Sequence, residues 1–331
     1  MSLSIVVPVY NEEESLKILY KEISEVIASI DVDLELIFID DGSTDASWSI
    51  IADLAREDAR VRGIRFRRNF GKAAALDVGL HAATNPIVMT MDADLQDDPR
   101  EIPDFLRLVD EGYDCVSGWK KTRHDPWHKV IPSRIFNKMV SSLTGVKLHD
   151  HNCGMKIYRR EIFDEIRLYG ELHRFIPSLV AARGWKVGEK VVHHRARKFG
   201  HSKYGFNRFI KGFLDLLSVK FVTQYGTRPQ HFLGTVGICS FAVGSLTLLW
   251  LAFRWTLARL PLVGTGAYTL SGRPAVVYSA ALMLFGAQLL SIGFIAELIV
   301  HQHHRVSREY SIKERTDPPE ESNADAERRQ S

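Results

Sequence analysis

The sequence has few cysteines and almost no net charge. Its 331 residues include three widely separated cysteines, and the formal net charge is +3. An odd number of scattered cysteines provides no disulfide framework and fits a reducing compartment. The small net charge gives no indication of a nucleic-acid-binding protein. The first four residues carry no basic charge and lead directly into a predicted strand, so we expect no signal peptide.

Two common nucleotide-binding loops are also missing. No Gly-x-Gly-x-x-Gly follows the first predicted strand, and no Gly-Lys-Ser/Thr occurs anywhere in the chain. Their absence argues against a dinucleotide-dependent dehydrogenase and against a P-loop ATPase. The first predicted strand is followed instead by Pro8-Val9-Tyr10-Asn11-Glu12.

Apolar runs and amphipathic segments alternate over residues 1–115, which predicts an α/β fold with a mostly parallel sheet. In such sheets, ligands bind at the carboxyl ends of the strands. Polar clusters follow three of the predicted strands, at 8–12, 40–45 and 92–94, so we expect them to meet in one cleft. The predicted strands are 4–9, 34–40, 61–66 and 86–91, and the predicted helices are 13–28, 46–58 and 72–82.

The segment Met91-Asp92-Ala93-Asp94-Leu95-Gln96 is the strongest functional signal. Side chains alternate along an extended chain, so Asp92 and Asp94 should point the same way. Two carboxylates at a strand end suit Mg²⁺ or Mn²⁺, and Gln96 can supply a third oxygen. The alternative is a turn with solvated carboxylates. The buried strand before it and the second acidic cluster at 40–45 favour the metal site.

That second cluster is Asp40-Asp41-Gly42-Ser43-Thr44-Asp45. Asp40 or Asp41 should face a ligand, where a carboxylate can accept hydrogen bonds from a base or from ribose. Gly42 allows a sharp turn. We interpret Asp45 as mainly structural, at the start of the next helix.

Two uncharged runs of 22 residues, Phe232–Phe253 and Ala275–Ala296, are each long enough to cross a bilayer core of ~30 Å. Two buried core helices are the alternative, but two such runs in one soluble domain would be unusual. The short connection at 254–274 places both termini on one side, and the flanking basic residues favour the inside.

These features divide the chain into four parts. Residues 1–203 form the α/β domain, and 204–230 are expected to form basic amphipathic helices at the membrane surface. Residues 231–300 form the two-helix transmembrane hairpin. The polar tail at 301–331 is expected to be disordered.

Four segments together resemble the family-2 glycosyltransferases with a GT-A fold: 5–12, 39–45, 68–72 and 92–97. The Asp-Ala-Asp-Leu-Gln form is similar to the subgroup that makes polyprenyl-phosphate sugars, such as dolichol-phosphate mannose synthase. The two C-terminal spans resemble the bactoprenol glucosyltransferase type. The resemblance covers about residues 4–300. It implies an inverting transfer of a sugar from a UDP- or GDP-linked donor to a membrane polyprenyl phosphate, for glycan or cell-envelope modification.

The same resemblance implies site residues. Those expected to contact the nucleotide sugar are Pro8, Tyr10, Glu12, Asp40, Asp41, Lys72, Asp92, Ala93 and Gln96. Those expected to hold Mg²⁺ or Mn²⁺ are Asp92, Asp94 and Gln96. The catalytic set is expected to be Asp94, Arg197, Lys203 and Asp150.

Arg197–Tyr204 fits an Arg-x-x-Gly-x-Ser-Lys pattern that lies over the donor diphosphate in the family. Arg197 and Lys203 are suitable partners for phosphates, and attraction to anionic lipid is a compatible alternative. A phosphate acceptor is already ionised near neutral pH, so Asp150 should orient groups rather than take a proton. The candidates for binding the acceptor phosphate are Lys120, Lys129, Ser133 and Arg134. The pattern His149-x-His151-x-Cys153 lacks a second ligand pair, so we discount zinc.

The predicted partners are a nucleotide sugar, a polyprenyl phosphate and the bilayer, with no nucleic acid and with a homo-oligomer left open. Nucleotide sugars are cytosolic, so the catalytic domain and both termini should be cytoplasmic. One alternative is a processive polysaccharide synthase, although Leu251 stands where its Gln-x-x-Arg-Trp motif needs glutamine. Another is a non-catalytic scaffold with this fold, which the intact acidic and basic sets disfavour.

Overall fold

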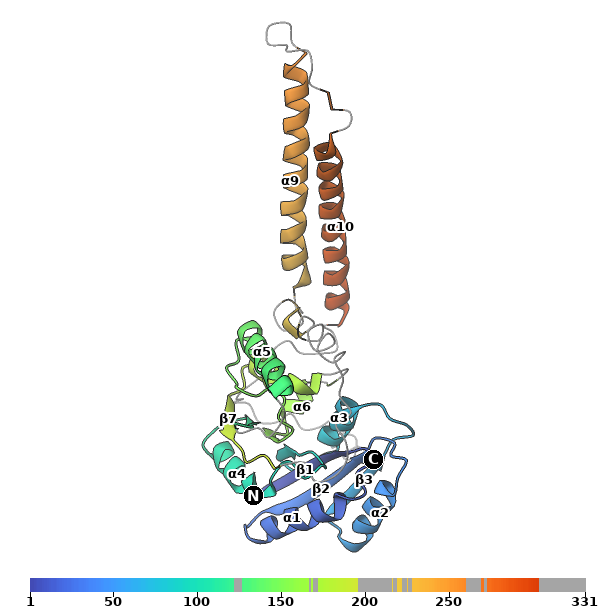
Figure 1. Ribbon diagram of the computed structural model, residues 1–331, viewed down its shortest axis with the longest axis vertical. Helices are drawn as coiled ribbons and strands as arrows, with labels where there is room; N and C mark the ends of the chain where they lie inside the picture. The colour runs from blue at the N-terminus through green and yellow to red at the C-terminus, as the bar shows by residue number, and fades with distance from the viewer. Residues whose placement is uncertain are drawn as a thin grey trace, which may run out of the picture.

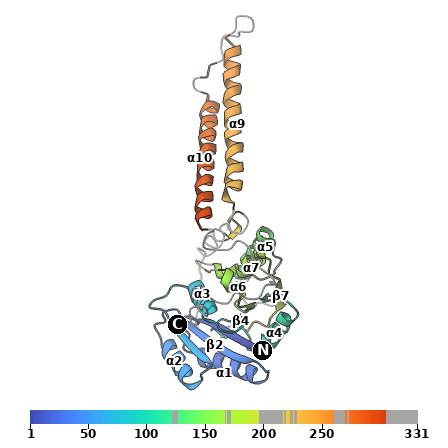
Figure 2. The same cartoon turned by 180° about the vertical axis from the view of Figure 1, so that it is seen from behind.

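The computed structural model describes residues 1–121, 127–166, 168, 172–195, 216, 219–221, 225, 228–259, 269–270 and 273–303. An α/β domain holds all the described strands, and two long helices extend away from it (Figure 1). The view from behind shows the same separation between domain and paired helices (Figure 2).

A seven-stranded sheet forms the centre of the α/β domain, with strand order β3-β2-β1-β4-β6-β5-β7. Six of the strands are parallel to one another, and β6 alone runs antiparallel to its neighbours β4 and β5. The predicted mostly parallel sheet is therefore confirmed. The strands are β1 Ser2–Val9, β2 Asp33–Asp40, β3 Val61–Arg65, β4 Ile87–Thr90, β5 Cys115–Trp119, β6 Lys156–Arg159 and β7 Val187–Val191.

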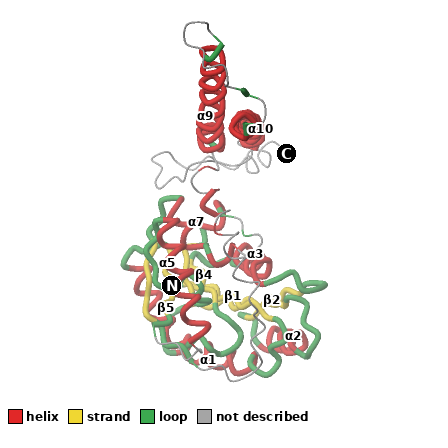
Figure 3. The backbone as a smooth tube through the Cα atoms, turned by 45° about the horizontal axis from the view of Figure 1, so that its top comes forward, coloured by secondary structure: helices red, strands yellow, loops and turns green. Residues whose placement is uncertain are grey.

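Helices cover both faces of the sheet, which explains why its central strands are continuously apolar in sequence. In β1, Ile5 and Val7 pack with residues of α1, α2 and α4, whereas Val6 packs on the opposite face with α3, α6 and α7. Figure 3 shows the strands between these helices. The helices are α1 Leu16–Ala28, α2 Ser47–Glu57, α3 Lys72–Ala82, α4 Ile102–Asp110, α5 Trp127–Thr144, α6 Ile162–Glu165 and α7 Ile176–Ala182, with 3₁₀ turns η1 Pro99–Glu101 and η2 Leu172–Arg174.

The two long helices are α9 Pro229–Leu257 and α10 Pro274–His303. Each contains an apolar window of mean hydropathy 2.0, of which only 17% and 11%, respectively, is buried inside the protein. The helices approach closely at small residues: a Cβ on Gly286 would lie 2.5 Å from the backbone nitrogen of Phe241. Large apolar side chains such as Leu246 and Leu298 point outward. Long, paired helices with an apolar outer surface are suited to lipid rather than to water.

Two of the described residues between the domain and α9 pack against α5. Leu216 and Val219 are fully buried in a cluster with Phe136, Val140 and Phe175. Lys220 donates a hydrogen bond from Nζ to the carbonyl of Leu143, at 2.9 Å. These apolar side chains therefore face α5 rather than lipid. Most of the amphipathic segment predicted at 204–230, and the tail beyond residue 303, lie outside the described residues.

Candidate active site

The carboxyl ends of β1, β2, β4 and β5 lie at one edge of the sheet, and antiparallel β6 begins there. This edge therefore receives the loops at 10–15, 41–46 and 91–98, as the sequence predicts. It also receives Lys156, the first residue of β6, whose position depends on the antiparallel insertion that the sequence did not reveal.

The loops after β1 and β2 are joined by side-chain hydrogen bonds. Asn11 accepts at Oδ1 from the backbone nitrogen of Thr44 (2.8 Å) and donates its own N–H to Ser43 Oγ (3.0 Å). The backbone of Glu12 donates to Ser47 Oγ at 2.9 Å. Asn11 has a φ of 56°, which asparagine tolerates better than most residues. The two loops thus form a single rigid wall, on which Tyr10 is half-buried.

The two acids at the end of β2, Asp40 and Asp41, make internal contacts. Asp40 is fully buried, accepts the N–H of Ser43 at 2.9 Å and pairs with Arg65 of β3 at 3.1 Å. Asp41 accepts the N–H groups of Phe70 (2.7 Å) and Gly71 (2.9 Å), which shapes the loop before α3. Burial and the charge of Asp40 raise the pKa of Asp41, although these two hydrogen bonds oppose the rise. Nucleotide contact by either acid remains a prediction.

Gly42 allows the approach between this turn and the loop before α3. Its φ is +71°, and an added Cβ would lie 2.7 Å from both Arg68 Cα and the backbone nitrogen of Asn69. Any other residue would be strained in this conformation and would also displace that loop.

The segment after β4 turns at Ala93 and Asp94, and Leu95 has a φ of 61°, so the extended chain that the sequence predicts is wrong here. Buried and half-buried residues still alternate along the segment. Met91, Ala93 and Leu95 are buried in the core, at 0%, 4% and 1% exposure. The three predicted ligand residues between them, Asp92, Asp94 and Gln96, are half-buried. Asp94 also accepts the N–H of Gln96 through Oδ1, at 3.2 Å.

The donor set of this segment fits a hard divalent cation only in part. Among the residues that the structure describes, no three His, Cys, Asp or Glu side chains gather into a metal site. Asp92 forms an ion pair with Lys72. Mg²⁺ in nucleotide sites commonly takes one or two carboxylates and completes its shell with water and phosphate oxygens. The oxygens of Asp94 and Gln96 suit an ion that shares a diphosphate in this way.

A cluster of lysines surrounds Asp92. Lys72 pairs with it from the first turn of α3. Lys120, which follows β5, lies 3.1 Å from the carboxylate of buried Asp97. Lys156 is buried and donates from Nζ to the carbonyl of Cys153. Lys120, which the sequence suggested for the acceptor phosphate, thus belongs to this same cluster.

The charges in this cluster stabilise one another. Burial acts to raise the pKa of Asp92, but Lys72, Lys120 and Lys156 hold it far below its ordinary value. Burial acts to lower the pKa of Lys120, but nearby carboxylates, Asp97 foremost, raise it well above its ordinary value. Burial lowers the pKa of Lys156. Asp92 and Lys120 are therefore both charged at neutral pH.

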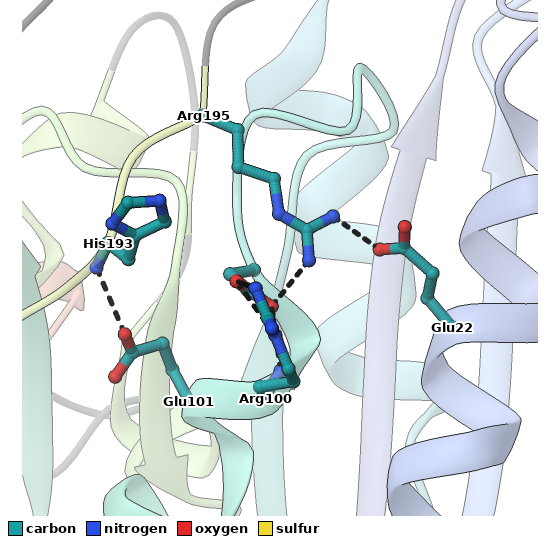
Figure 4. A network of polar contacts seen from close by, with 6 residues as sticks. Glu22, Arg100, Glu101, His193 and Arg195 are labelled. Atoms are coloured by element: carbon teal, nitrogen blue, oxygen red, sulfur yellow. Dashed lines mark hydrogen bonds and ion pairs between the residues drawn. The ribbon is translucent and has the colours of Figure 1, made fainter.

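A network of polar contacts ties His193 and Arg195 to Glu22 of α1 and to residues 98–101 (Figure 4). Arg195 donates its backbone N–H to the carbonyl of Gln96 at 2.9 Å, beside an antiparallel bridge between His194 and Asp97. Its guanidinium contacts Glu22 of α1 at 2.6 Å and Asp98 at 2.7 Å. Local sequence patterns do not reveal this arrangement, because its partners are far apart in the chain.

The predicted catalytic residues Arg197 and Lys203 lie outside the described residues, two and eight positions after Arg195. Of the acceptor candidates, Ser133 and Arg134 lie on α5, half-buried and exposed, respectively. Lys129 is also in α5, but its side chain is outside what the structure describes.

Asp150 lies in the loop before β6 and is 1% exposed. Its Oδ1 accepts the N–H of Asn152 at 3.0 Å, and its carbonyl accepts from Ser117 Oγ at 3.4 Å. His151 is bonded through Nε2 to Ser141 at 3.0 Å. Burial, aided by the charge of Lys156, lowers the pKa of His151 to about 4, so the ring is neutral.

Comparisons with known proteins agree with this architecture. The family described as "Glycosyl transferase family 2" matches residues 4–167. Dodecaprenyl-phosphate galacturonate synthase of Rhizobium johnstonii is 39% identical over 92% of this chain and 89% of its own. Undecaprenyl-phosphate 4-deoxy-4-formamido-L-arabinose transferase of Enterobacter sp. is 33% identical over 90% of this chain and 88% of its own.

Solved structures show the same fold at lower identity. Glucosyl-3-phosphoglycerate synthase from Mycobacterium tuberculosis, in complex with Mn²⁺, uridine diphosphate and phosphoglyceric acid, is 20% identical, with a TM-score of 0.51. The similarity covers 67% of this chain and 78% of that one. It supports the GT-A fold that the sequence predicts.

Proposed function

The chain belongs to glycosyl transferase family 2, and from this we propose that it is a membrane-anchored glycosyltransferase that transfers a sugar from a nucleotide sugar to a polyprenyl phosphate. The observation that carries the proposal is the convergence of Asp92, Asp94 and the lysine cluster at the carboxyl edge of the sheet, in the domain held by α9 and α10. Such an edge is where parallel sheets bind ligands.

The donor would lie across the ends of β1, β2 and β4. Tyr10 and Asp41 stand beside the expected position of the nucleoside, on the wall formed by the first two loops. Asp94 and Gln96, with Asp92, would hold Mg²⁺ or Mn²⁺. The ion would offset the charge of the diphosphate and so make it a better leaving group.

Although burial acts against it, the charges of Lys72, Lys120 and Lys156 hold the pKa of Asp92 far below its ordinary value, so Asp92 would be ionised before a donor binds. Arg195 fastens the chain two residues before Arg197 to the backbone of Gln96. Arg197 and Lys203 are therefore our candidates for further contacts to the donor phosphates. Fixed positive charge of this kind stabilises negative charge that develops on a departing diphosphate.

The reaction is a direct displacement. An oxygen of the acceptor phosphate attacks the anomeric carbon as the bond from that carbon to the diphosphate oxygen breaks, and the anomeric configuration inverts. The phosphate is ionised already, so no proton needs to be removed. Asp150 would orient the acceptor from its buried loop, and Ser133, Arg134 and Lys129 of α5 are the candidates to bind its phosphate.

The two long helices would cross the membrane as a hairpin, with the catalytic domain and both termini in the cytoplasm. The basic residues before α9 and after α10 support this orientation, as does the cytosolic supply of nucleotide sugars. A homo-oligomer remains a further possibility to test, by measuring the mass of the purified protein in detergent.

The decisive experiment measures transfer to undecaprenyl phosphate from a panel of labelled UDP- and GDP-sugars, with and without Mn²⁺. UDP-linked galacturonate and 4-deoxy-4-formamido-L-arabinose belong in the panel because relatives are named for these sugars. We expect one lipid-linked monosaccharide, formed only with the metal. A growing polymer would favour the processive alternative, and donor binding without transfer to any lipid would favour the scaffold.

A further inference from the structure

One carboxylate outside the predicted site holds the loop that carries Asp150. Glu189 lies in β7, and its side chain is 12% exposed. Its Oε1 accepts the backbone N–H groups of both His149 (2.8 Å) and Asp150 (2.9 Å). Its Oε2 contacts Nδ1 of the His149 ring at 2.7 Å. Three contacts thus join one strand residue to two consecutive residues of the loop.

The opposite side of the same loop is held by α5. Asn137 donates from Nδ2 to the carbonyl of His149 at 3.0 Å, and its Oδ1 lies 3.4 Å from the N–H of His151. Asn137 is one helical turn from Ser133 and Arg134, the candidates for the acceptor phosphate. The loop therefore connects the sheet, through Glu189, with the helix that carries these candidates.

The His149 ring extends this connection to the end of β5. It stacks on Trp119 with ring centroids 4.0 Å apart and an angle of 11° between the planes. Trp119 directly precedes Lys120, whose ammonium is paired with Asp97 in the lysine cluster. Glu189 thus fixes a ring that borders the site as well as the backbone of Asp150.

We propose that Glu189 is a positioning residue for the acceptor half of the reaction. Glu189 holds the loop at 149–152, and this loop fixes the positions of Asp150 and of α5. Glu189 therefore controls where the acceptor phosphate binds relative to the donor. This inference rests on the proposed function. The part of the site expected to bind the donor is held by other contacts, those of Asn11, Asp41 and Arg195. None of these contacts involves Glu189.

Replacing Glu189 tests this role. Glu189→Ala leaves two backbone N–H groups without their acceptor, which frees the loop to shift. Glu189→Gln keeps an amide oxygen that can accept from both. Asp114→Ala is the matched control, because Asp114 also accepts a backbone N–H (Lys186, 2.8 Å) and pairs with an arginine (Arg159, 3.0 Å), but precedes β5 at the opposite end of the sheet.

Steady-state kinetics would be measured with the lipid and the donor varied separately, on the full chain in detergent. For Glu189→Ala we expect kcat/KM for undecaprenyl phosphate to fall by about 10- to 100-fold, as a misplaced reacting group can cost this much. The KM for the nucleotide sugar should stay within about twofold, and Glu189→Gln should recover most of the loss. Asp114→Ala should lower the melting temperature without this selective effect.

Two results would overturn the inference. One is lipid kinetics of Glu189→Ala that match the wild type, and the other is an equal loss for donor and lipid in both alanine variants, which indicates a general loss of stability. If Glu189→Ala does not fold, Asn137→Ala tests the same loop from α5 and should show the same selectivity for the lipid. A wild-type protein without transfer to lipid would refute the proposed function instead, before any variant is compared.

Discussion

The carboxylate of Asp92 rests against Gly154, in the loop before β6, so closely that a Cβ on Gly154 would lie 2.6 Å from Oδ2 and 2.7 Å from Oδ1. Thr90 Oγ1 holds the carbonyl of Gly154 at 2.8 Å, so the backbone there is fixed. Lys72 pairs with the same carboxylate. The orientation of Asp92 is therefore set by glycine backbone as well as by charge.

This contact predicts the effect of Gly154→Ala. The added methyl group must displace Asp92, so we expect kcat/KM to fall by at least about tenfold. Gly184→Ala is the control: Gly184 has a φ of +92° but nothing within 4 Å of an added Cβ. It should cost about 1 kcal/mol of stability and leave catalysis unchanged. Wild-type kinetics of Gly154→Ala would show that Asp92 need not keep this position.

The metal assignment predicts that Asp94→Asn abolishes transfer. An amide retains an oxygen ligand but loses the negative charge, so it holds a divalent ion much more weakly. Calorimetric titration should show that Mn²⁺ no longer strengthens the binding of the nucleoside diphosphate. Asp53→Asn, on the exposed surface of α2, is the control and should behave as the wild type. Full activity of Asp94→Asn would remove the residue from the metal site.

The contacts of Arg195 predict a loss of both stability and donor binding in Arg195→Ala. The substitution leaves the nearly buried Asp98 with Arg100 as its remaining arginine partner. We expect a loss of about 1–3 kcal/mol in unfolding free energy and a raised KM for the nucleotide sugar. Arg107→Ala removes exposed ion pairs on α4 and should change neither quantity. An unchanged donor KM in Arg195→Ala would separate this network from donor binding.

Stability should depend on pH through His151. Its pKa in the folded protein is about 4, because burial and Lys156 oppose its protonation, compared with 6.5 in an unperturbed histidine. Between these values the unfolded chain binds a proton that the folded chain does not. The free energy of unfolding therefore falls as pH decreases from 6.5 to 4, by up to ~1.4 kcal/mol per pH unit.

Urea unfolding at pH 7.5, 6 and 5 measures this slope, and His151→Asn should reduce it. The pKa of His173 is also lowered by burial and by Lys72, so part of the slope should remain. The acids with lowered pKa values, such as Asp98 at about 2, add to this loss of stability only when the pH falls below about 4. An identical slope in the wild type and His151→Asn would show that His151 is not held neutral.

Local patterns in the sequence predicted the first half of the fold well. Apolar runs located β1, β2, β3 and β4 to within two residues at each end. The strands β1, β2 and β4 are buried on both faces, whereas the edge strand β3 is mostly exposed. The sequence predicts the alternation of Asp92 and Asp94 with Met91, Ala93 and Leu95 from the period of an extended chain, but the structure produces it with a turn at Ala93 and Asp94. Both uncharged runs lie in helices that are long and apolar enough to cross a membrane.

The remainder depends on contacts between distant segments, which local patterns do not encode. The antiparallel β6 enters the sheet between β4 and β5, although it lies after both in the chain. Glu189 and Asp150 are 39 positions apart, and nothing near Glu189 marks it as a partner. No local pattern marks Gly154 either, because its role depends on contact with the Asp92 carboxylate, which lies in a different segment after β4.

The burial of Leu216 and Val219 against α5 has a consequence for the lipid substrate. These side chains, and the hydrogen bond from Lys220 Nζ to the carbonyl of Leu143, hold part of the segment before α9 against the domain. Under the proposed function, this contact would limit how far the reaction centre can move relative to the bilayer. An acceptor would then react only if its phosphate headgroup reaches the reaction centre. Under the proposed function, chains of different isoprenoid length present the same headgroup and should serve as comparable acceptors.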